Sequence, residues 1–337
     1  MKHLRKFLFP FAGLYYIITL LRNKAYDNGF MSYKKYQLPV ICIGNLNTGG
    51  TGKSPMTEYL IRILKNNYKV ATLSRGYGRK TKGYFQVNSN SLAENVGDEP
   101  LQFAKKFDDV TVSVCEDRQS GISKLLQLTP PLEVIILDDA YQHRKVKAGF
   151  QILLTAYYDL YTDDFLLPAG NLREARKGAH RAHSIIVTKC PKRISQSERD
   201  VIISKLKPLP HQKVYFTTIN YSDMLMSDTS HLPVSELKNR AFTLVTGIAN
   251  PKPLVTHLQN LGLNFDHKIY GDHHNFALSE IKELEMLDLI VTTEKDYVRL
   301  SPLLVDKSLY YLPIEASFIE EASIFDNQVL SFVKDFN

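Results

Sequence analysis

A glycine-rich turn carries the residues of this sequence that are best suited to phosphate chemistry. It reads NTGGTGKSP at 47–55, between the apolar run VICIG and a segment whose apolar residues have helical spacing. Glycines allow successive N–H groups to point at one anion, and the following helix adds its positive N-terminal end. The P-loop pattern needs this geometry, although it has glycine where this chain has Asn47. An ordinary glycine-rich strand-to-helix turn is the alternative.

We therefore expect the turn to bind the phosphates of a nucleotide. Lys53 is expected to reach the β- and γ-phosphates, and the Ser54 hydroxyl is expected to ligate Mg²⁺. The expected nucleotide-binding residues are Asn47, Thr48, Gly49, Gly50, Thr51, Gly52, Lys53 and Ser54.

Two adjacent carboxylates complete the expected metal site. Asp138 and Asp139 follow four apolar residues, Val134–Leu137. P-loop enzymes take an acidic metal ligand from the end of a second strand, and that end faces the crevice in which α/β sheets bind ligands. We predict that both carboxylates lie beside Mg²⁺; the alternative is a solvated loop.

Three further motifs are weaker candidates when taken alone. Asp98 and Glu99 open a helix, where a carboxylate is also a routine cap. Arg118 could stabilise charge on a transferring phosphate or form a surface salt bridge. His273 and His274 lie either in an ordinary surface loop or where one imidazole orients a carboxylate, and too few other ligands are evident for a metal site.

Two other segments bear on substrate and base recognition. The loop GNLREARKG crowds charged residues together, which indicates an anion site or else a solvated face; they are Arg173, Glu174, Arg176 and Lys177. After a late strand, Thr188 and Lys189 are followed by Pro191, so the carboxylate that reads guanine in many P-loop proteins is missing. Adenine is therefore the expected base.

The composition is that of an ordinary globular protein. The chain has 337 residues, 44% hydrophobic and 23% charged, which is long enough for two domains with real cores. Its formal net charge of +7 favours an anionic partner: a phosphorylated substrate, an acidic membrane or nucleic acid. Cys42, Cys115 and Cys190 are far apart, so neither a disulfide framework nor a zinc site is indicated and a reducing cytosol fits best.

The N-terminus has the composition of a membrane-interfacial helix. An uncharged run of 15 residues, 7–21, is flanked by Lys2, Arg5, Lys6, Arg22 and Lys24. A spanning helix needs about 20 residues, and no signal-peptide cleavage site follows. We expect a helix in the interface, with Tyr15 and Tyr16 at headgroup depth, and the alternative is a helix buried against the domain.

Apolar runs alternate with helical segments in the rhythm of a doubly wound parallel sheet. Expected strands are 40–43, 70–73, 110–114, 134–137, 152–154 and 185–187, and expected helices include 57–65, 100–107 and 198–206. A strand and a helix restart after a polar stretch at 221–240. We therefore expect an α/β fold with a helix at 1–30 that belongs to the first domain, a P-loop core at 31–225 and a smaller C-terminal α/β domain at 226–337.

Seven motifs together resemble one family, the tetraacyldisaccharide 4′-kinases of lipid A (lipopolysaccharide) biosynthesis. They are IGNLNTGGTGKSP, LSRGYGRK, GDEP, LDDAYQHR, LPAGNLREAR, GDHHNF and TTEKD, in the family's order between 41 and 296. The family often has Ser where this chain has Asn47, Thr where it has Ser54 and Pro where it has Asn171. The hydroxyl is kept at 54, and the other two changes concern the geometry of the P-loop and of the substrate loop.

The resemblance implies a kinase that uses ATP and Mg²⁺. Its acceptor would be the 4′-hydroxyl of a tetraacylated glucosamine disaccharide 1-phosphate, and its product lipid IVA. It implies a peripheral or monotopic enzyme at the cytoplasmic face of the bacterial inner membrane, whose partners are the lipid substrate and the membrane surface. The smaller domain would close over an active site between the domains. Neither nucleic acid nor an obligate protein partner is expected.

The resemblance also assigns roles to matched positions. Asp98 resembles the general base, assisted by His273 in preference to His274, and Glu99 is a further candidate for the metal. The catalytic set is Lys53, Asp98, Arg118, Asp138, Asp139 and His273. The less certain substrate-binding set is Arg75, Gly76, His143, Asn171, Arg173 and Glu174.

Two other functions remain open from the residues alone. A membrane-associated P-loop ATPase switch would keep the P-loop and the acids but would hydrolyse ATP without any acceptor. A nucleic-acid-binding ATPase would fit the pI near 9.0, although basic residues outside the N-terminus are scattered and no nucleic-acid-binding module is recognisable.

Overall fold

The computed structural model describes residues 4–305 and 307–336, so Lys2 of the expected basic flank lies outside the described residues. Its strands form two sheets. The larger sheet contains β1 (Val40–Asn45), β2 (Val70–Ser74), β3 (Phe85–Val87), β4 (Thr111–Val114), β5 (Val134–Leu137), β6 (Phe150–Ala156), β7 (Ser184–Thr188), β8 (Lys213–Tyr221) and β15 (Ile314–Phe318). The smaller contains β9 (Met224–Met226), β10 (His231–Pro233), β11 (Thr243–Thr246), β12 (Asp266–Ile269), β13 (Ile290–Thr293) and β14 (Leu309–Leu312).

The larger sheet is mostly parallel, as predicted. Its order is β15-β8-β7-β6-β1-β5-β2-β4-β3, and the edge strands β3 and β15 run antiparallel to their neighbours. Every residue of β1 is buried, because a central parallel strand has both faces covered. All six predicted strands are present.

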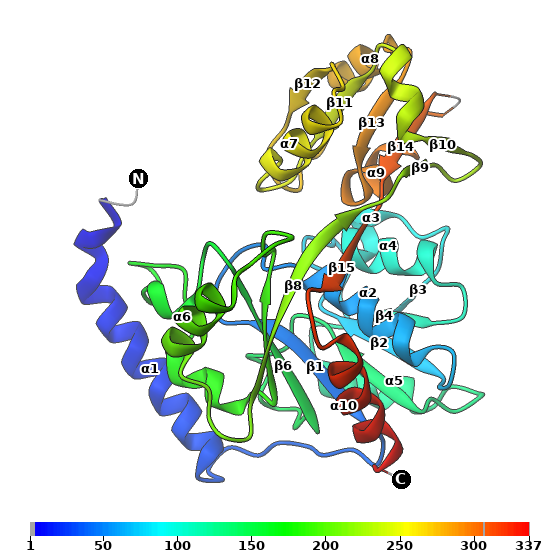
Figure 1. The fold of residues 1–337 in the computed structure, drawn as a ribbon. Helices are drawn as coiled ribbons and strands as arrows, with labels where there is room; N and C mark the ends of the chain where they lie inside the picture. Colours follow the sequence, from blue (N-terminus) through cyan, green and yellow to red (C-terminus); the bar gives the residue numbers. More distant parts are fainter. Residues whose placement is uncertain (1–3, 306, 337) are drawn as a thin grey trace.

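Helices cover both faces of this sheet (Figure 1). The α-helices are α1 (Phe9–Asp27), α2 (Lys53–Leu64), α3 (Ala93–Val96), α4 (Asp98–Lys106), α5 (Arg118–Leu125), α6 (Gln196–Leu206), α7 (Lys252–Asn260), α8 (Leu278–Glu285), α9 (Glu294–Leu300) and α10 (Ala322–Lys334). Helices α2, α4 and α10 share one core with Ile41 and Ile43 of β1. Helix α5 packs on the opposite face with Val40, and α6 packs there with Leu153 of β6. The predicted doubly wound arrangement is thus confirmed.

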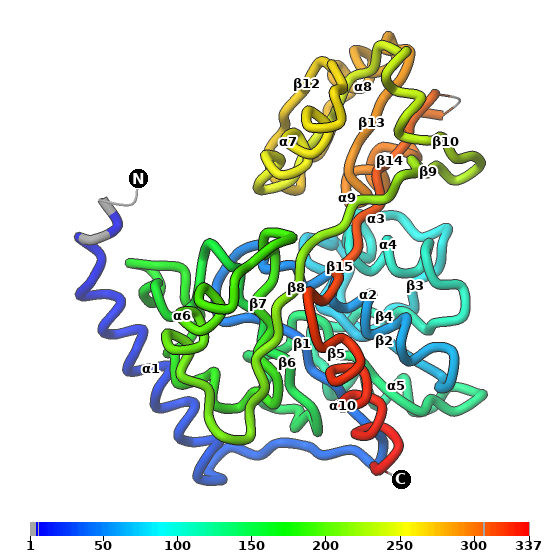
Figure 2. Tube along the Cα trace, viewed as in Figure 1, coloured from blue at the N-terminus to red at the C-terminus, as the bar shows by residue number. Residues whose placement is uncertain are grey.

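The smaller unit begins where β8 leaves the larger sheet, close to the predicted boundary at 225/226. The predicted end of this unit at 337 is wrong, because β15 returns and pairs antiparallel with β8, and α10 packs on the core of the larger sheet. Figure 2 shows the two strands running side by side between the units. The pairing could not be read from local sequence, since it joins segments about a hundred residues apart.

The carboxyl ends of the parallel strands face the smaller unit. This follows from topology, because β8 runs parallel to β7 and its end leads into that unit. Strands β6, β1, β5, β2 and β4 continue the same parallel direction. Loops at this edge therefore lie where ligands of open α/β sheets bind.

A buried ion network joins the two units. The ammonium group of Lys106, at the end of α4, lies 2.7 Å from Glu58 of α2 and 2.8 Å from Glu294 of α9. Burial, and the neighbouring charge of Glu58, raise the pKa of Glu294 to about 7, although Lys106 opposes this shift. Lys106 is the cation shared by two carboxylates whose side chains are 1% and 8% exposed.

Replacing Lys106 by Met is expected to lower the free energy of unfolding by about 3 kcal/mol or more, because a buried carboxylate then has no cation. The loss should be largest above pH 7 and smaller below it, since protonated Glu294 needs no positive partner. Urea unfolding on both sides of that pH measures it. The matched control is Lys105→Met, whose exposed pair with Asp228 at 2.9 Å is worth about 1 kcal/mol at most. Equal losses in both variants would contradict this account.

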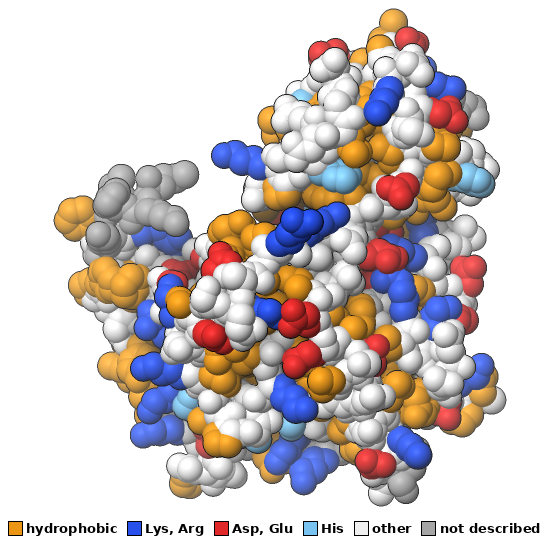
Figure 3. Space-filling view, viewed as in Figure 1, with side chains coloured by type: hydrophobic (Ala, Val, Ile, Leu, Met, Phe, Trp, Pro, Cys, Tyr) orange, Lys and Arg blue, Asp and Glu red, His pale blue; other side chains and the backbone are white. Residues whose placement is uncertain are grey.

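Helix α1 presents its apolar face to solvent. The exposed residues recur at helical spacing, and Figure 3 shows hydrophobic side chains along this edge of the molecule. They are Phe9, Phe11, Leu14, Ile17, Ile18 and Leu21, and Phe7 of the preceding 3-10 helix, Leu4–Leu8, is exposed as well. The alternative of a helix buried by its apolar residues is therefore wrong, but Tyr15 points inward and donates a hydrogen bond to the carbonyl of Arg173 at 2.8 Å. Within the described ranges, no helix combines the length and hydropathy needed to cross a bilayer.

Candidate active site

The P-loop joins the end of β1 to the start of α2. Gly52 adopts a φ of +79°, which a side chain would strain, and α2 begins at Lys53. The Thr188 hydroxyl donates to the carbonyl of Thr51 at 2.7 Å, and Lys189 donates to the carbonyl of Gly50 at 2.5 Å. Thr188 and Lys189, which were considered above for base recognition, therefore support the phosphate loop.

The predicted metal-side acids lie opposite this loop. Asp138 is buried at the end of β5 and accepts a hydrogen bond from Thr57 of α2 at 3.1 Å. Asp139 lies 3.8 Å from the Lys53 ammonium group and accepts a bond from Arg173 at 2.8 Å. The structure thus brings Lys53, Asp138 and Asp139 together, as the sequence predicts, and adds Thr57 and Arg173.

The two carboxylates have opposite electrostatic environments. Burial, and then the negative charge of Asp139, raise the pKa of Asp138 to about 6, while Lys53 opposes the shift. Burial also acts to raise the pKa of Asp139, but Lys53 and Arg173 outweigh it and hold this pKa below the usual value. Asp139 is therefore the more permanent anion of the two.

The candidate base is held at the first turn of α4. Gly97 precedes it with a φ of +93°, and a Cβ built there would lie 3.1 Å from the Cα of Gly76. This close approach of two backbones fixes Asp98 beside the 75–79 loop, which contains Gly76 of the predicted substrate-binding set. Arg75 is exposed, and no hydrogen bond or ion pair with another described residue engages it.

The structure distinguishes the two neighbouring histidines. His273 Nδ1 lies 2.8 Å from Asp98 Oδ2, a contact between the smaller unit and the P-loop core. His274 Nε2 instead lies 2.8 Å from Glu280 of α8, and its ring stacks on Tyr270. Of the two histidines, His273 is thus the one that contacts Asp98.

Helix α9 contributes two residues to which we gave no role from sequence. Lys295 Nζ lies 3.0 Å from His273 Nε2 and 3.1 Å from Glu99 Oε1. Arg299 Nε lies 3.6 Å from Asp98 Oδ2. The sequence TTEKDYVRL contained a signal, because Lys295 and Arg299 follow the end of a strand and lie four residues apart, on one face of a helix. The sequence does not show which residues that face contacts.

Three of the other predicted residues have structural contacts. Arg118 donates to the carbonyl oxygens of Cys115 at 2.9 Å and Asp138 at 3.2 Å, so it holds two strand ends. Asn171 accepts from Thr48 N–H at 2.7 Å through its carbonyl. The Glu174 carboxylate is 3% exposed and accepts bonds from Asn23, Gln142 and Arg181. These contacts position α1 and the loops around the site.

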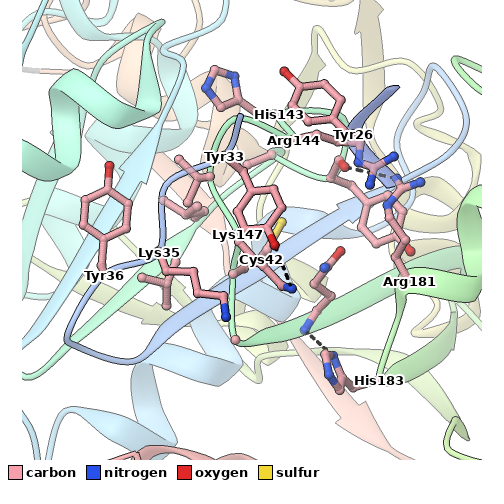
Figure 4. A pocket seen from close by; sticks show the side chains of 18 of the residues that line it. Tyr26, Tyr33, Lys35, Tyr36, Cys42, His143, Arg144, Lys147, Arg181 and His183 are labelled. Atoms are coloured by element: carbon pink, nitrogen blue, oxygen red, sulfur yellow. Dashed lines mark hydrogen bonds between the residues drawn. The ribbon is translucent and has the colours of Figure 1, made fainter. Parts of the chain in front are cut away.

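His143 lies apart from this cluster. It lines a cavity of about 570 Å³ beneath the linker between α1 and β1, where Lys35 and Lys147 extend into the same space with His183 beyond them (Figure 4). No phosphate-binding or metal-binding candidate is among the lining residues. Burial, and then the charge of Arg118, lower the pKa of His143 to about 4, so its imidazole is neutral.

The described residues suit a nucleotide phosphate with Mg²⁺. The Asn47 amide and the Thr51 hydroxyl are buried in the loop without partners among the described residues, and both can donate to a phosphate oxygen. Within the described ranges no group of three His, Cys, Asp or Glu side chains could enclose a metal. Mg²⁺ needs none, because it takes one or two carboxylates together with phosphate and water oxygens. Ser54, Asp138 and Asp139 can fill that role.

Comparison with known proteins agrees with this geometry. The model of the family described as tetraacyldisaccharide-1-P 4′-kinase (LpxK) matches residues 4–334. A tetraacyldisaccharide 4′-kinase of Flavobacterium johnsoniae is 48% identical over 338 residues, with 99% of each chain covered. One of Bacteroides thetaiotaomicron is 41% identical over 357 residues, covering 98% of this chain and 94% of that one.

A solved structure is similar in fold. The "apo" form of LpxK from Aquifex aeolicus, in complex with ATP, has a TM-score of 0.79 and 31% identity, and the match covers 98% of this chain and 99% of that one. The resemblance seen in the seven motifs is confirmed by the family match over nearly the whole chain. The chain therefore belongs to the tetraacyldisaccharide 4′-kinase family.

Proposed function

We propose that this chain transfers the γ-phosphate of ATP to the 4′-hydroxyl of a tetraacyldisaccharide 1-phosphate, with Asp98 as the general base. The observation that supports this most is the 2.8 Å contact between Asp98 and His273, made at the edge of the sheet that carries the P-loop. Asp98 is 6% exposed, so the carboxylate itself is largely shielded from water. A carboxylate within hydrogen-bond reach of the acceptor hydroxyl takes its proton as the new P–O bond forms.

The remaining residues position and neutralise charge, which is most of what phosphoryl transfer requires. The P-loop N–H groups and Lys53 hold the phosphates. Ser54, Asp138 and Asp139 hold Mg²⁺, which when bound supplies charge neutralisation on the transferring group. Arg173 keeps Asp139 in place through its 2.8 Å bond. Glu99 forms an ion pair with Lys295 in this structure. If Glu99 ligates the metal, as proposed, that contact would replace the ion pair.

The smaller unit, 224–312, is proposed to close over the bound substrates. It carries His273, and its contact with Asp98 forms only where the two units meet. Closure would exclude water and keep His273 on Asp98 while both substrates are bound, which is the usual purpose of such motions. The proposal covers the same domains as the sequence analysis, except that β15 and α10 stay with the core.

The dependence of ATP turnover on the acceptor tests this function against an ATPase switch. The kinase requires ADP release to depend on added tetraacyldisaccharide 1-phosphate, because water is a poor substitute for a hydroxyl placed beside Asp98. ADP release at the same rate without the lipid would favour the switch. Because the chain belongs to a kinase family, the ATPase switch is the less favoured of the two functions.

We further propose that α1 lies in the cytoplasmic face of the inner membrane, with its exposed apolar stripe in the headgroup boundary. Two side chains join the N-terminal segment to the predicted substrate loop. Arg5, in the 3-10 helix just before α1, contacts Asn171, and Tyr15 of α1 donates to the carbonyl of Arg173. A membrane-embedded stripe would thus place that loop at the height of the lipid substrate. The partners proposed are the acylated substrate and the membrane surface, with neither nucleic acid nor an obligate protein partner.

Replacing Phe11 and Ile18 together by Glu is expected to weaken binding to anionic phospholipid vesicles by at least about tenfold, because two apolar side chains are lost and two charges are added. Both residues are more than half exposed, so folding should be unaffected. Vesicle flotation measures the change. Val201→Glu on α6 is the control, since it makes the same kind of change at a residue 59% exposed outside α1. Equal binding by both variants would contradict the proposed orientation.

A further inference from the structure

Helix α9 directs two cations at the loop that carries His273. It begins directly after β13 and packs against α4, the helix that begins with Asp98. Lys295 and Arg299 lie four residues apart and therefore on one face of this helix. Arg299 contacts the backbone of the loop, donating to the carbonyls of His274 at 2.9 Å and Gly247 at 3.2 Å.

The backbone at His273 is held independently of its side chain. The residue has a φ of +56°, in the left-handed region, and its N–H donates to the Gly247 carbonyl at 3.2 Å. Asp296 fixes Gly247 in turn by accepting its N–H at 2.8 Å. These backbone contacts do not decide which of the two ring nitrogens of His273 carries the proton, because both tautomers have the same heavy-atom shape.

We propose that Lys295 is a positioning residue that sets the tautomer of His273, a role that rests on the proposed function of the Asp98–His273 pair. A lysine ammonium group has donors and no acceptor, so at 3.0 Å from Nε2 it requires a lone pair there. The imidazole proton must then sit on Nδ1, which donates to Asp98 Oδ2 across 2.8 Å. The other carboxylate oxygen, Oδ1, is left to accept the proton of the acceptor hydroxyl.

The opposite tautomer would be unproductive. With the proton on Nε2, the Nδ1 lone pair would face the Asp98 carboxylate, and two acceptors would repel at that distance. An intact catalytic cluster with the wrong histidine tautomer can lose up to about 10⁴-fold in kcat. Lys295 disfavours this tautomer, because the imidazole Nε2–H and the ammonium N–H of Lys295 would then be two donors pointing at each other.

The charges around Lys295 keep it at the imidazole. Glu99 of α4 lies 3.1 Å from its ammonium group, and Asp272 of the histidine loop lies 3.6 Å away. The two carboxylates attract the ammonium group to the space between α4 and the loop, where it lies 3.0 Å from Nε2. The Tyr77 ring lies against the imidazole and adds no charge.

The test compares Lys295→Met and Lys295→Arg with the wild type, and Lys282→Met on α8 serves as the exposed-lysine control. The ¹⁵N chemical shifts of the His273 ring, assigned with His273→Gln, report the tautomer in the full chain at alkaline pH. We expect Nδ1–H in the wild type and in Lys282→Met, and loss of this preference in Lys295→Met. The kcat of Lys295→Met should fall about 10- to 1,000-fold with the KM for ATP unchanged, and Lys295→Arg should recover part of it.

Three outcomes would overturn the proposal: an Nε2–H tautomer in the wild type, an unchanged tautomer in Lys295→Met, or an unchanged kcat in that variant. The wild-type spectrum decides the first even if the Met variant fails to fold. Failure of the proposed function is distinguishable, because it would show as a wild-type chain that makes no phosphorylated lipid while the tautomer signal is still readable.

Discussion

Replacing Asp98 by Asn should lower kcat by about 10²- to 10⁴-fold and leave the KM for ATP nearly unchanged. The amide keeps the shape of the carboxylate, and its oxygen can still accept the His273 Nδ1–H bond, which is 2.8 Å long in the wild type. It cannot take a proton from the acceptor hydroxyl. Steady-state kinetics with varied ATP and saturating lipid measure both constants.

The neighbouring residue provides a matched control for this variant. His274 makes a 2.8 Å contact with Glu280 that has the same chemistry but lies outside the site. Glu280→Gln therefore removes the charge from an equivalent histidine–carboxylate pair and should leave kcat near the wild-type value. Normal turnover by Asp98→Asn would remove Asp98 from the role of base, and an equal loss in both variants would point to general damage of the loop.

Replacing Asp138 by Asn should abolish kinase activity and at the same time stabilise the fold. Burial, together with Asp139, raises the pKa of this carboxyl from 3.8 to about 6, so its ionised form is disfavoured in the folded chain. The upward shift of about two pKa units corresponds to about 3 kcal/mol. This net shift already includes the opposing attraction to Lys53, so we expect a gain of about 3 kcal/mol at most.

The sign of the pH dependence follows from linkage. Below pH 3.8 the carboxyl is protonated in both states and carries no penalty; between 3.8 and about 6 only the unfolded chain ionises; above about 6 the full penalty applies. The stabilisation by Asp138→Asn should therefore be absent near pH 4 and complete above pH 6. Urea unfolding without nucleotide and with a chelator measures it.

Asp139→Asn should have the opposite effect on stability. Lys53 and Arg173 outweigh burial and hold the pKa of Asp139 below its usual value, so its ionised form stabilises the fold at neutral pH. The amide variant should unfold more easily than the wild type. If both amide variants shift stability in the same direction, the electrostatic description of the pair is wrong.

Local patterns in the sequence were sufficient to place the glycine-rich turn before α2 and the two acids after β5. Four apolar residues followed by Asp138 and Asp139 predict a buried strand with acids at its end, and both features are present. The pairing of Asp98 with His273 needed the family resemblance, because 175 positions separate them. No local pattern specifies contacts between segments that far apart.

Some residues had the right chemistry but a different position. Glu174 was expected in the less certain substrate-binding set, but Arg181 and other donors satisfy its carboxylate in the interior. His143 lines a separate cavity. Lys295 is the opposite case: it was given no role from the sequence, and only the packing of α9 on α4 shows that its ammonium group reaches an imidazole. Residue type is local information, whereas the atom that a side chain faces is set by tertiary packing.

Transfer of labelled γ-phosphate from ATP to a tetraacyldisaccharide 1-phosphate tests the central claim most directly. The reaction is run in mixed micelles with Mg²⁺, with Lys53→Ala as the blank because we propose that this lysine, the first residue of α2, holds the phosphates. The account predicts labelled lipid from the wild-type chain and none from the variant. Free labelled phosphate without labelled lipid would contradict it, since the P-loop would then serve hydrolysis and not transfer to the sugar.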